Sequence, residues 1–111
     1  MKEIITMKLL EDLFEILEKS ENYYKIELAS KEHPIFKAHF PQNEILPGFI
    51  QIDIIASILN HRISTITKAK FLSIIRPKDI IEYYISNINE NKYKVIIKNE
   101  NKKISEITYE S

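Results

Sequence analysis

Hydrophobic and polar positions along the chain follow two different periods. Over residues 7–19, leucine and phenylalanine recur every three or four positions with acidic residues between them, which predicts an amphipathic helix that covers an open end of the domain. Over residues 22–30, apolar positions such as Ile26 and Leu28 alternate with charged positions such as Glu27. This period of two is typical of a half-buried strand.

The second half of the chain changes to extended segments. Short connections rich in asparagine separate these segments, and asparagine tolerates the left-handed backbone of tight turns. Short connections force neighbouring strands to run antiparallel, so we expect a meander. In the last segment Ile104 and Ile107 fall out of phase, which predicts a bulge or a loose edge. The expected strands are residues 63–76, 80–87, 92–98 and 102–109.

Between the two halves, the apolar run PGFIQIDIIASILNH is long enough for a buried helix. Pro47 suits the first helical position, which needs no backbone N–H donor. The following residues are apolar nearly all round, which is typical of a helix inside a protein. Asp53, Ser57 and Asn60 are spaced four and three apart, so they share one narrow stripe. A carboxyl group on a buried helix needs a partner or a proton, which makes Asp53 a candidate functional residue.

Gly48 is the only glycine in the chain, and glycine is used where the backbone turns sharply or is approached closely. The first N–H groups of a helix lack intrahelical acceptors and carry the positive end of the helix dipole. An oxygen bearing negative charge can bind there, and a side chain at position 48 would crowd it. Asp53 follows at about 7.5 Å along the axis, at 1.5 Å per residue. Gly48 and Asp53 can therefore face one small substrate.

Length and composition indicate one α+β domain over residues 1–111. The chain is 44% hydrophobic, enough for a core, and its elements give an antiparallel sheet wrapped around one central buried helix. Sixteen basic residues balance sixteen acidic ones, so no nucleic-acid footprint is expected. There is no cysteine for a disulfide or a thiolate site, and acidic residues interrupt any signal peptide or membrane span near the N-terminus. We therefore expect a cytoplasmic protein.

The stretch over residues 33–53, HPIFKAHFPQNEILPGFIQID, combines a histidine, a Pro-Gly turn and a helix carboxylate. Its spacing resembles the active-site segment of the beta-hydroxyacyl carrier-protein dehydratases, hotdog-fold enzymes of fatty-acid and polyene synthesis. In that family a histidine in a GHFP-like motif precedes, by fourteen residues, an Asp or Glu on the central helix. Here His39 opens the HFP motif, Pro47 and Gly48 form the turn, and Asp53 supplies the acid.

The resemblance implies a single hotdog domain that removes water from (3R)-3-hydroxyacyl thioesters to give trans-2-enoyl thioesters. It implies that His39 and Asp53 are catalytic, His39 as the base and Asp53 as the acid, while the Gly48 amide polarises the thioester carbonyl. No cofactor is expected, because the substrate is carried on the phosphopantetheine of an acyl carrier protein. The residues expected to line the substrate site are Phe40, Pro47, Phe49 and Ser57.

Three positions depart from the family pattern. Ala38 replaces the glycine before the histidine, and Ser57 replaces a glutamine one turn after the acid. A fainter likeness covers KAKFLSIIRPKD, residues 68–79, which corresponds to a strand and a "PGD" turn of these enzymes. In this turn Lys78 stands in place of the glycine.

Several cations gather near the motif in the sequence. They are either the solvated face of a strand or a docking surface for the acidic carrier protein, and they are Lys37, Lys68, Lys70, Arg76 and Lys78. We expect His33 to order the turn before Pro34, and His61 to end the helix, where a cation suits the dipole. No histidine spacing indicates a metal site.

Two other functions remain open from the sequence. The same pocket can serve a hotdog thioesterase, with Asp53 as a base for water attacking the thioester carbonyl. The chain can instead be a non-catalytic acyl-binding or partner subunit, a reading favoured by Ala38, Ser57 and the small size of the domain. The family resemblance also implies a homodimer or an oligomer of dimers, with sheets joined edge to edge and the histidine and acid drawn from different subunits.

Overall fold

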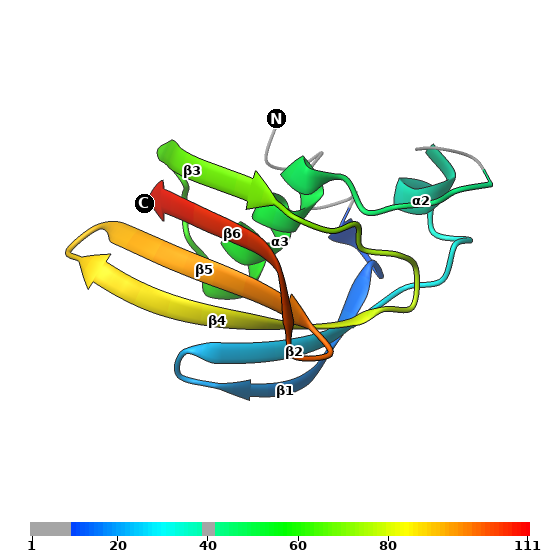
Figure 1. The fold of residues 1–111 in the computed structure, drawn as a ribbon, viewed down its shortest axis with the longest axis horizontal. Coiled ribbons are helices and arrows are strands. Elements are labelled where there is room, and N and C mark those ends of the chain that lie inside the picture. The colour runs from blue at the N-terminus through cyan, green and yellow to red at the C-terminus, as the bar shows by residue number, and fades with distance from the viewer. Residues whose placement is uncertain (1–9, 39–41) are drawn as a thin grey trace.

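A six-stranded antiparallel sheet curves around one long helix in the computed structural model, which describes residues 10–38 and 42–111 (Figure 1). The strand order is β1-β2-β4-β5-β6-β3. Within residues 10–38 and 42–111, the helices with defined bounds are α2 Pro34–Ala38 and α3 Gly48–Leu59. The strands are β1 Phe14–Ser20, β2 Tyr23–Leu28, β3 Thr65–Phe71, β4 Ile80–Asn89, β5 Lys92–Asn99 and β6 Lys102–Glu110.

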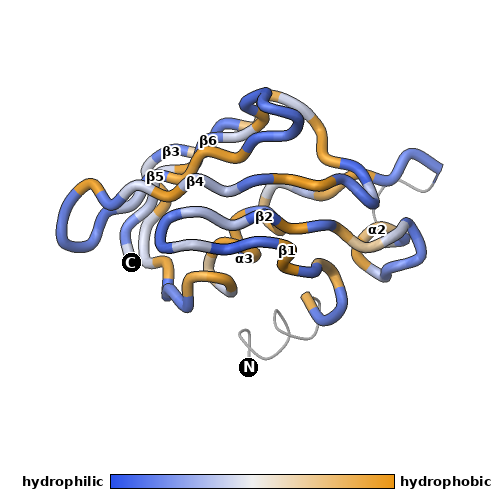
Figure 2. Tube along the Cα trace, turned by 90° about the horizontal axis from the view of Figure 1, so that it is seen from below, coloured by the Kyte–Doolittle hydropathy of each residue, from blue (hydrophilic) through white to orange (hydrophobic). Residues whose placement is uncertain are grey.

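The α+β class and most predicted strands are confirmed. Alternation in β2 buries Ile26 and Leu28, and β4, β5 and β6 form the expected meander. The β5–β6 turn places Glu100 and Asn101 at φ of 52° and 65°, the left-handed conformation of a two-residue hairpin turn. The hairpin turns are hydrophilic in Figure 2, whereas the inner side of the sheet and α3 contribute the apolar core.

The helix predicted over residues 7–19 is wrong from residue 11 onward, and Leu10 is the one residue of that range that is helical in the described part of the chain. Residues 11–13 form a turn, and Phe14–Ser20 is the edge strand β1. The register against β2 shifts between Ile16 and Glu18, and this bulge interrupts the alternation of a regular strand. Apolar residues three and four apart therefore fit a bulged strand here as well as a helix.

Two expectations about the strands in the second half need correction. The segment containing β3 is not part of the meander, because β3 pairs with β6 and ends the sheet. The bulge predicted from Ile104 and Ile107 is present in β6. Ile97 pairs with Ser105, and the next residue of β5, Lys98, pairs with Lys103. Ile104 therefore has no partner in β5, which defines the bulge. However, β6 is not a loose edge, because it lies between β5 and β3.

Helix α3 is only partly enclosed by its own chain. Its buried residues are Ile50, Gln51, Ile54 and Ile55, whereas Phe49 is 58% exposed. The sequence of α3 is apolar nearly all round and predicted a fully buried helix, whereas a single chain buries only part of its surface. Among the described residues, no helix is long and apolar enough to cross a membrane.

Candidate active site

The N-terminus of α3 is fixed by Pro47, which caps the helix instead of opening it. Pro47 has φ −61° and ψ 148°, an extended conformation, and its carbonyl accepts the N–H groups of Ile50 at 3.1 Å and Gln51 at 3.3 Å. The preceding residue, Leu46, donates its N–H to the Ile75 carbonyl at 2.8 Å. Gly48, not Pro47, is thus the first residue of the helix, and the segment after β3 anchors the loop that leads to it.

Gly48 is favoured here by a close approach and not by backbone conformation, since its φ is not positive. A Cβ atom on residue 48 would lie 2.7 Å from Cε2 and 2.8 Å from Cζ of Phe71. An aromatic ring from β3 therefore fills the space that a side chain at position 48 would take, while binding of a thioester oxygen by the Gly48 amide stays a prediction. The Phe71 side chain is 45% exposed, so it lies at the rim of the site.

Asp53 lies five residues after Gly48 on α3 and is half-buried. Of the other expected pocket residues, Pro47 is buried, Phe49 is exposed and Ser57 is exposed on the second half of the helix. His39, the expected base, and Phe40, expected to line the substrate site, lie outside the described residues. Helix α2 ends at Ala38, immediately before His39 in the sequence.

Sequence reasoning overlooked a buried polar pair that fastens α3 to the sheet. The Ser105 hydroxyl donates to Gln51 Oε1 at 2.7 Å, and both side chains are almost fully buried. Because Gln51 lies between Gly48 and Asp53, this hydrogen bond fixes the helix segment that carries both. The sequence did hold one sign of this pair, because Gln51 is a polar residue in an apolar helix and lies outside the stripe of Asp53, Ser57 and Asn60.

The two described histidines have structural partners. His33 Nε2 donates to the Glu11 carbonyl at 2.7 Å, and Nδ1 accepts the N–H of Ile35 at 3.1 Å, so His33 orders the start of α2 as expected. His61 instead packs on Tyr93 and lies 2.7 Å from the Tyr109 hydroxyl through Nδ1. Burial lowers the pKa of His61 below its ordinary 6.5, so the cation expected at the helix end is disfavoured.

The five cations proposed for carrier docking lie on different elements, and three of them have carboxylate partners within the chain. Lys37 pairs with Glu32 at 3.1 Å on α2, and Lys78 pairs with Glu27 at 3.5 Å. Arg76 is exposed in the segment before β4. Lys68 and Lys70 lie on β3, where Lys68 pairs with Glu106 at 2.7 Å.

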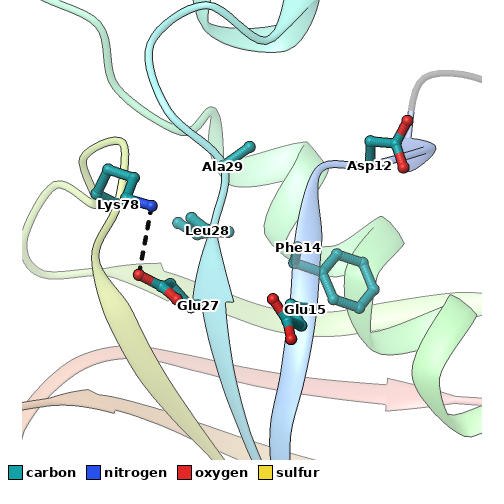
Figure 3. A pocket seen from close by; sticks show the side chains of 7 residues that line it. All are labelled: Asp12, Phe14, Glu15, Glu27, Leu28, Ala29 and Lys78. Atoms are coloured by element: carbon teal, nitrogen blue, oxygen red, sulfur yellow. Dashed lines mark ion pairs between the residues drawn. The ribbon is translucent and has the colours of Figure 1, made fainter.

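Lys78 also lines a shallow pocket of about 350 Å³ beside the β1 and β2 strands (Figure 3). The Glu27–Lys78 ion pair lies at one side of this pocket, and Phe14 and Leu28 contribute apolar surface. None of the expected catalytic residues lines it. Within the described residues, no group of His, Asp and Glu side chains is arranged to hold a metal ion.

The profile of the ApeI-like family, described as ApeI dehydratase, matches residues 16–108 of the chain. The chain belongs to the ApeI-like dehydratase family. The match includes the HFP motif, the Pro-Gly turn and Asp53, so the resemblance to hotdog dehydratases read from those residues is confirmed. No curated protein sequence matches the chain significantly.

Solved structures show that this ApeI-like chain has the hotdog fold. The dehydratase heterocomplex ApeI:P from Xenorhabdus doucetiae aligns with a TM-score of 0.67 and 17% identity over 86% of this chain and 92% of that chain. Thioesterase superfamily member 2 from Mus musculus aligns with a TM-score of 0.61 and 14% identity over 93% and 83%. PaaI from E. coli aligns with a TM-score of 0.61 and 10% identity over 96% and 88%.

Proposed function

We propose that this ApeI-like protein removes water from 3-hydroxyacyl thioesters carried on an acyl carrier protein, giving trans-2-enoyl thioesters. The observation that carries the proposal is the dehydratase family match over a segment that contains the candidate acid, base and turn. The geometry of α3 supports it, because Gly48 begins the helix and Asp53 follows on its second turn.

In the proposed reaction, His39 takes the C2 proton of the substrate while negative charge develops on the thioester oxygen. The backbone N–H groups at the start of α3, with the helix dipole, stabilise that oxygen. Asp53, in its carboxylic acid form, gives its proton to the hydroxyl group at C3, which leaves as water. The C2–H and C3–O bonds break, the C2=C3 bond forms, and one proton returns from His39 to Asp53 to complete the cycle.

We further propose that a second hotdog chain completes the site. Phe49 and Phe71 border the N-terminus of α3 and are each about half-exposed, at 58% and 45%. The neighbouring strand β3 is one of the two end strands of the sheet, and all seven of its residues are exposed. A second chain paired along β3 would cover these side chains and enclose the thioester, so the catalytic form is a dimer or an assembly of dimers.

A thioesterase is the second candidate, because thioesterase superfamily member 2 shares the fold. In that reaction Asp53 would act as a base, activating water to attack the thioester carbonyl and release a free thiol. The two reactions are separated by following enoyl-thioester absorbance and free thiol in the same sample. Enoyl formation without thiol release supports the dehydratase, whereas stoichiometric thiol release would overturn it. Tight acyl-carrier binding without either product would indicate a non-catalytic subunit.

A further inference from the structure

Two residues on adjacent strands contact the first turn of α3 at one point of the sheet. Phe71 of β3 and Ser105 of β6 lie directly opposite each other in the β3–β6 register. The Phe71 ring lies against Gly48, and the Ser105 hydroxyl donates to Gln51 Oε1 at 2.7 Å. Because Gln51 follows Gly48 by less than one helical turn, the two contacts act on the same short piece of helix.

This piece of helix carries a backbone donor that the chain leaves open. The first hydrogen bonds of α3 run from the N–H groups of Ile50 and Gln51 to the Pro47 carbonyl. The N–H of Gly48 is at the first helical position and donates to no residue that the structure describes. Pro47 has no side-chain oxygen to compete with a ligand for the N–H groups of this turn. The direction of the Gly48 N–H therefore depends on where the first turn of α3 lies.

The Gln51–Ser105 hydrogen bond contributes position more than stability. Gln51 and Ser105 are 3% and 0% exposed, and the other buried residues of α3 are isoleucines. Folding exchanges hydrogen bonds with water for this one, so apolar side chains of similar shape could stabilise the contact as well. Apolar contacts are not directional, whereas a hydrogen bond weakens steeply away from its preferred distance and angle. The polar pair therefore fixes how far α3 can slide or rotate on β6.

We propose that Gln51, held by Ser105, is a positioning residue for the dehydration, because it sets where the Gly48 N–H points. The inference rests on the proposed function, in which this N–H stabilises charge on the thioester oxygen. Such stabilisation needs a donor about 2.7–3.1 Å from the oxygen, and a displacement of about 1 Å can lower the rate about 100-fold. Loss of an interaction that matters only in the transition state lowers kcat and leaves KM nearly unchanged.

Removing one partner and removing both have different consequences. Gln51→Leu leaves the Ser105 hydroxyl buried without its acceptor, so stability and turnover should both fall. The double variant Q51L/S105A removes both polar groups, and its thermal unfolding should return toward that of the wild type. Its kcat should stay about tenfold or more below the wild type, with KM within about twofold, because the directional contact is still missing. Recovery of kcat together with stability would show a merely structural role and overturn the inference.

The Gly48 amide can be observed on its own, because Gly48 is the only glycine in the chain. Protein labelled with isotopically enriched glycine gives one backbone amide signal in a nitrogen–proton NMR spectrum. The probe is butyryl-pantetheine, a thioester without a hydroxyl group to eliminate. At saturation the Gly48 proton signal of the wild type should move downfield as the hydrogen bond to the thioester oxygen forms. In Q51L/S105A, or in Ser105→Ala if the double variant folds poorly, the movement should be less than about half as large.

Tyr109→Phe is the matched control, because it removes a buried hydroxyl that bonds to His61 just beyond the other end of α3. It should leave kcat, KM and the movement of the Gly48 signal at their wild-type values. Full movement of the signal in Q51L/S105A would overturn the positioning role and leave the proposed function standing. A reduced movement in the double variant, without enoyl formation by the wild type, keeps the positioning role and counts against the dehydratase. No movement in the wild type would overturn both.

Discussion

The ring of Phe71 lies against the α-carbon of Gly48, so that a Cβ atom at position 48 would come within 2.7 Å of the ring. This contact joins the edge strand β3 to the first residue of α3. It also places the Phe71 ring beside the backbone N–H groups that are proposed to bind the thioester. Substitution at either position therefore separates the role of the ring from the role of the backbone.

Gly48→Ala should lower dehydration turnover by up to about 100-fold, because the added methyl group and the displaced ring intrude where the thioester must lie. The free energy of unfolding should change by less than about 1 kcal/mol, since the exposed ring can swing aside. The control is Phe71→Ala in both backgrounds, with turnover and thermal unfolding measured for each. Full recovery of turnover in the double variant would show that only the ring matters, and would contradict a role for the glycine in accommodating the thioester.

Tyr83→Phe should stabilise the protein. The Tyr83 hydroxyl is buried and has no hydrogen-bond partner among the residues that the structure describes, and burial raises its pKa well above the ordinary value of 10.0. An unsatisfied buried polar group costs about 1 kcal/mol or more, and the variant removes it without removing the ring. Tyr109→Phe is the matched control, because that hydroxyl bonds to His61 and its loss should destabilise by about 1 kcal/mol. Urea unfolding of both variants measures the difference, and a destabilised Tyr83→Phe protein would show that the hydroxyl is satisfied in solution.

Lys78→Gly should also raise stability. Lys78 has φ of 70°, a conformation that costs about 1 kcal/mol for a residue with a side chain. The Lys78–Glu27 pair lost in the variant has an exposed lysine and contributes less than about 1 kcal/mol. Lys78→Ala loses the same ion pair while keeping the strained backbone, so it should be neutral or slightly destabilising. Equal unfolding midpoints for the glycine and alanine variants would argue against strain at this turn.

Glu106 gives the fold an acid-sensitive component. Its folded pKa is about 2 against an ordinary 4.5, so the carboxylate is favoured in the folded state. The stabilisation is present above the unfolded pKa and is lost as the pH falls from about 4.5 toward 2. Glu106→Gln should reduce stability near pH 7 and flatten its dependence on pH over that window. Glu100→Gln in the exposed β5–β6 turn is the control, and an identical pH profile for wild type and Glu106→Gln would refute the assignment.

Much of the fold was predictable from local pattern. The alternation of Ile26 and Leu28 predicted β2, and the phase break between Ile104 and Ile107 predicted the bulge in β6. Pattern failed in β1, where a bulge after Ile16 mimics helical spacing. It also could not predict that β3 pairs with β6, because strand order depends on long-range packing around α3.

The candidate site was predictable only in part. Spacing predicted a helix at the Pro-Gly turn that carries Asp53, as the structure shows, although the helix begins at Gly48 and not at Pro47. The Phe71 contact and the buried Gln51–Ser105 hydrogen bond join segments far apart in the sequence. Such contacts depend on tertiary structure and leave no periodic signal. The same holds for Glu106, which forms ion pairs with Lys68 on β3, Lys94 on β5 and Lys103 on its own strand.

The most direct test of the proposed chemistry is the conversion of a 3-hydroxyacyl thioester on a carrier protein, followed by enoyl-thioester absorbance. The wild-type chain and Asp53→Asn are each assayed at low and at high protein concentration, where any pairing of chains is least and most complete. We predict conversion by the wild type, and a loss of about 100-fold or more in Asp53→Asn with unfolding unchanged. Full conversion by the Asn variant, or none by the wild type in either state, would contradict the account.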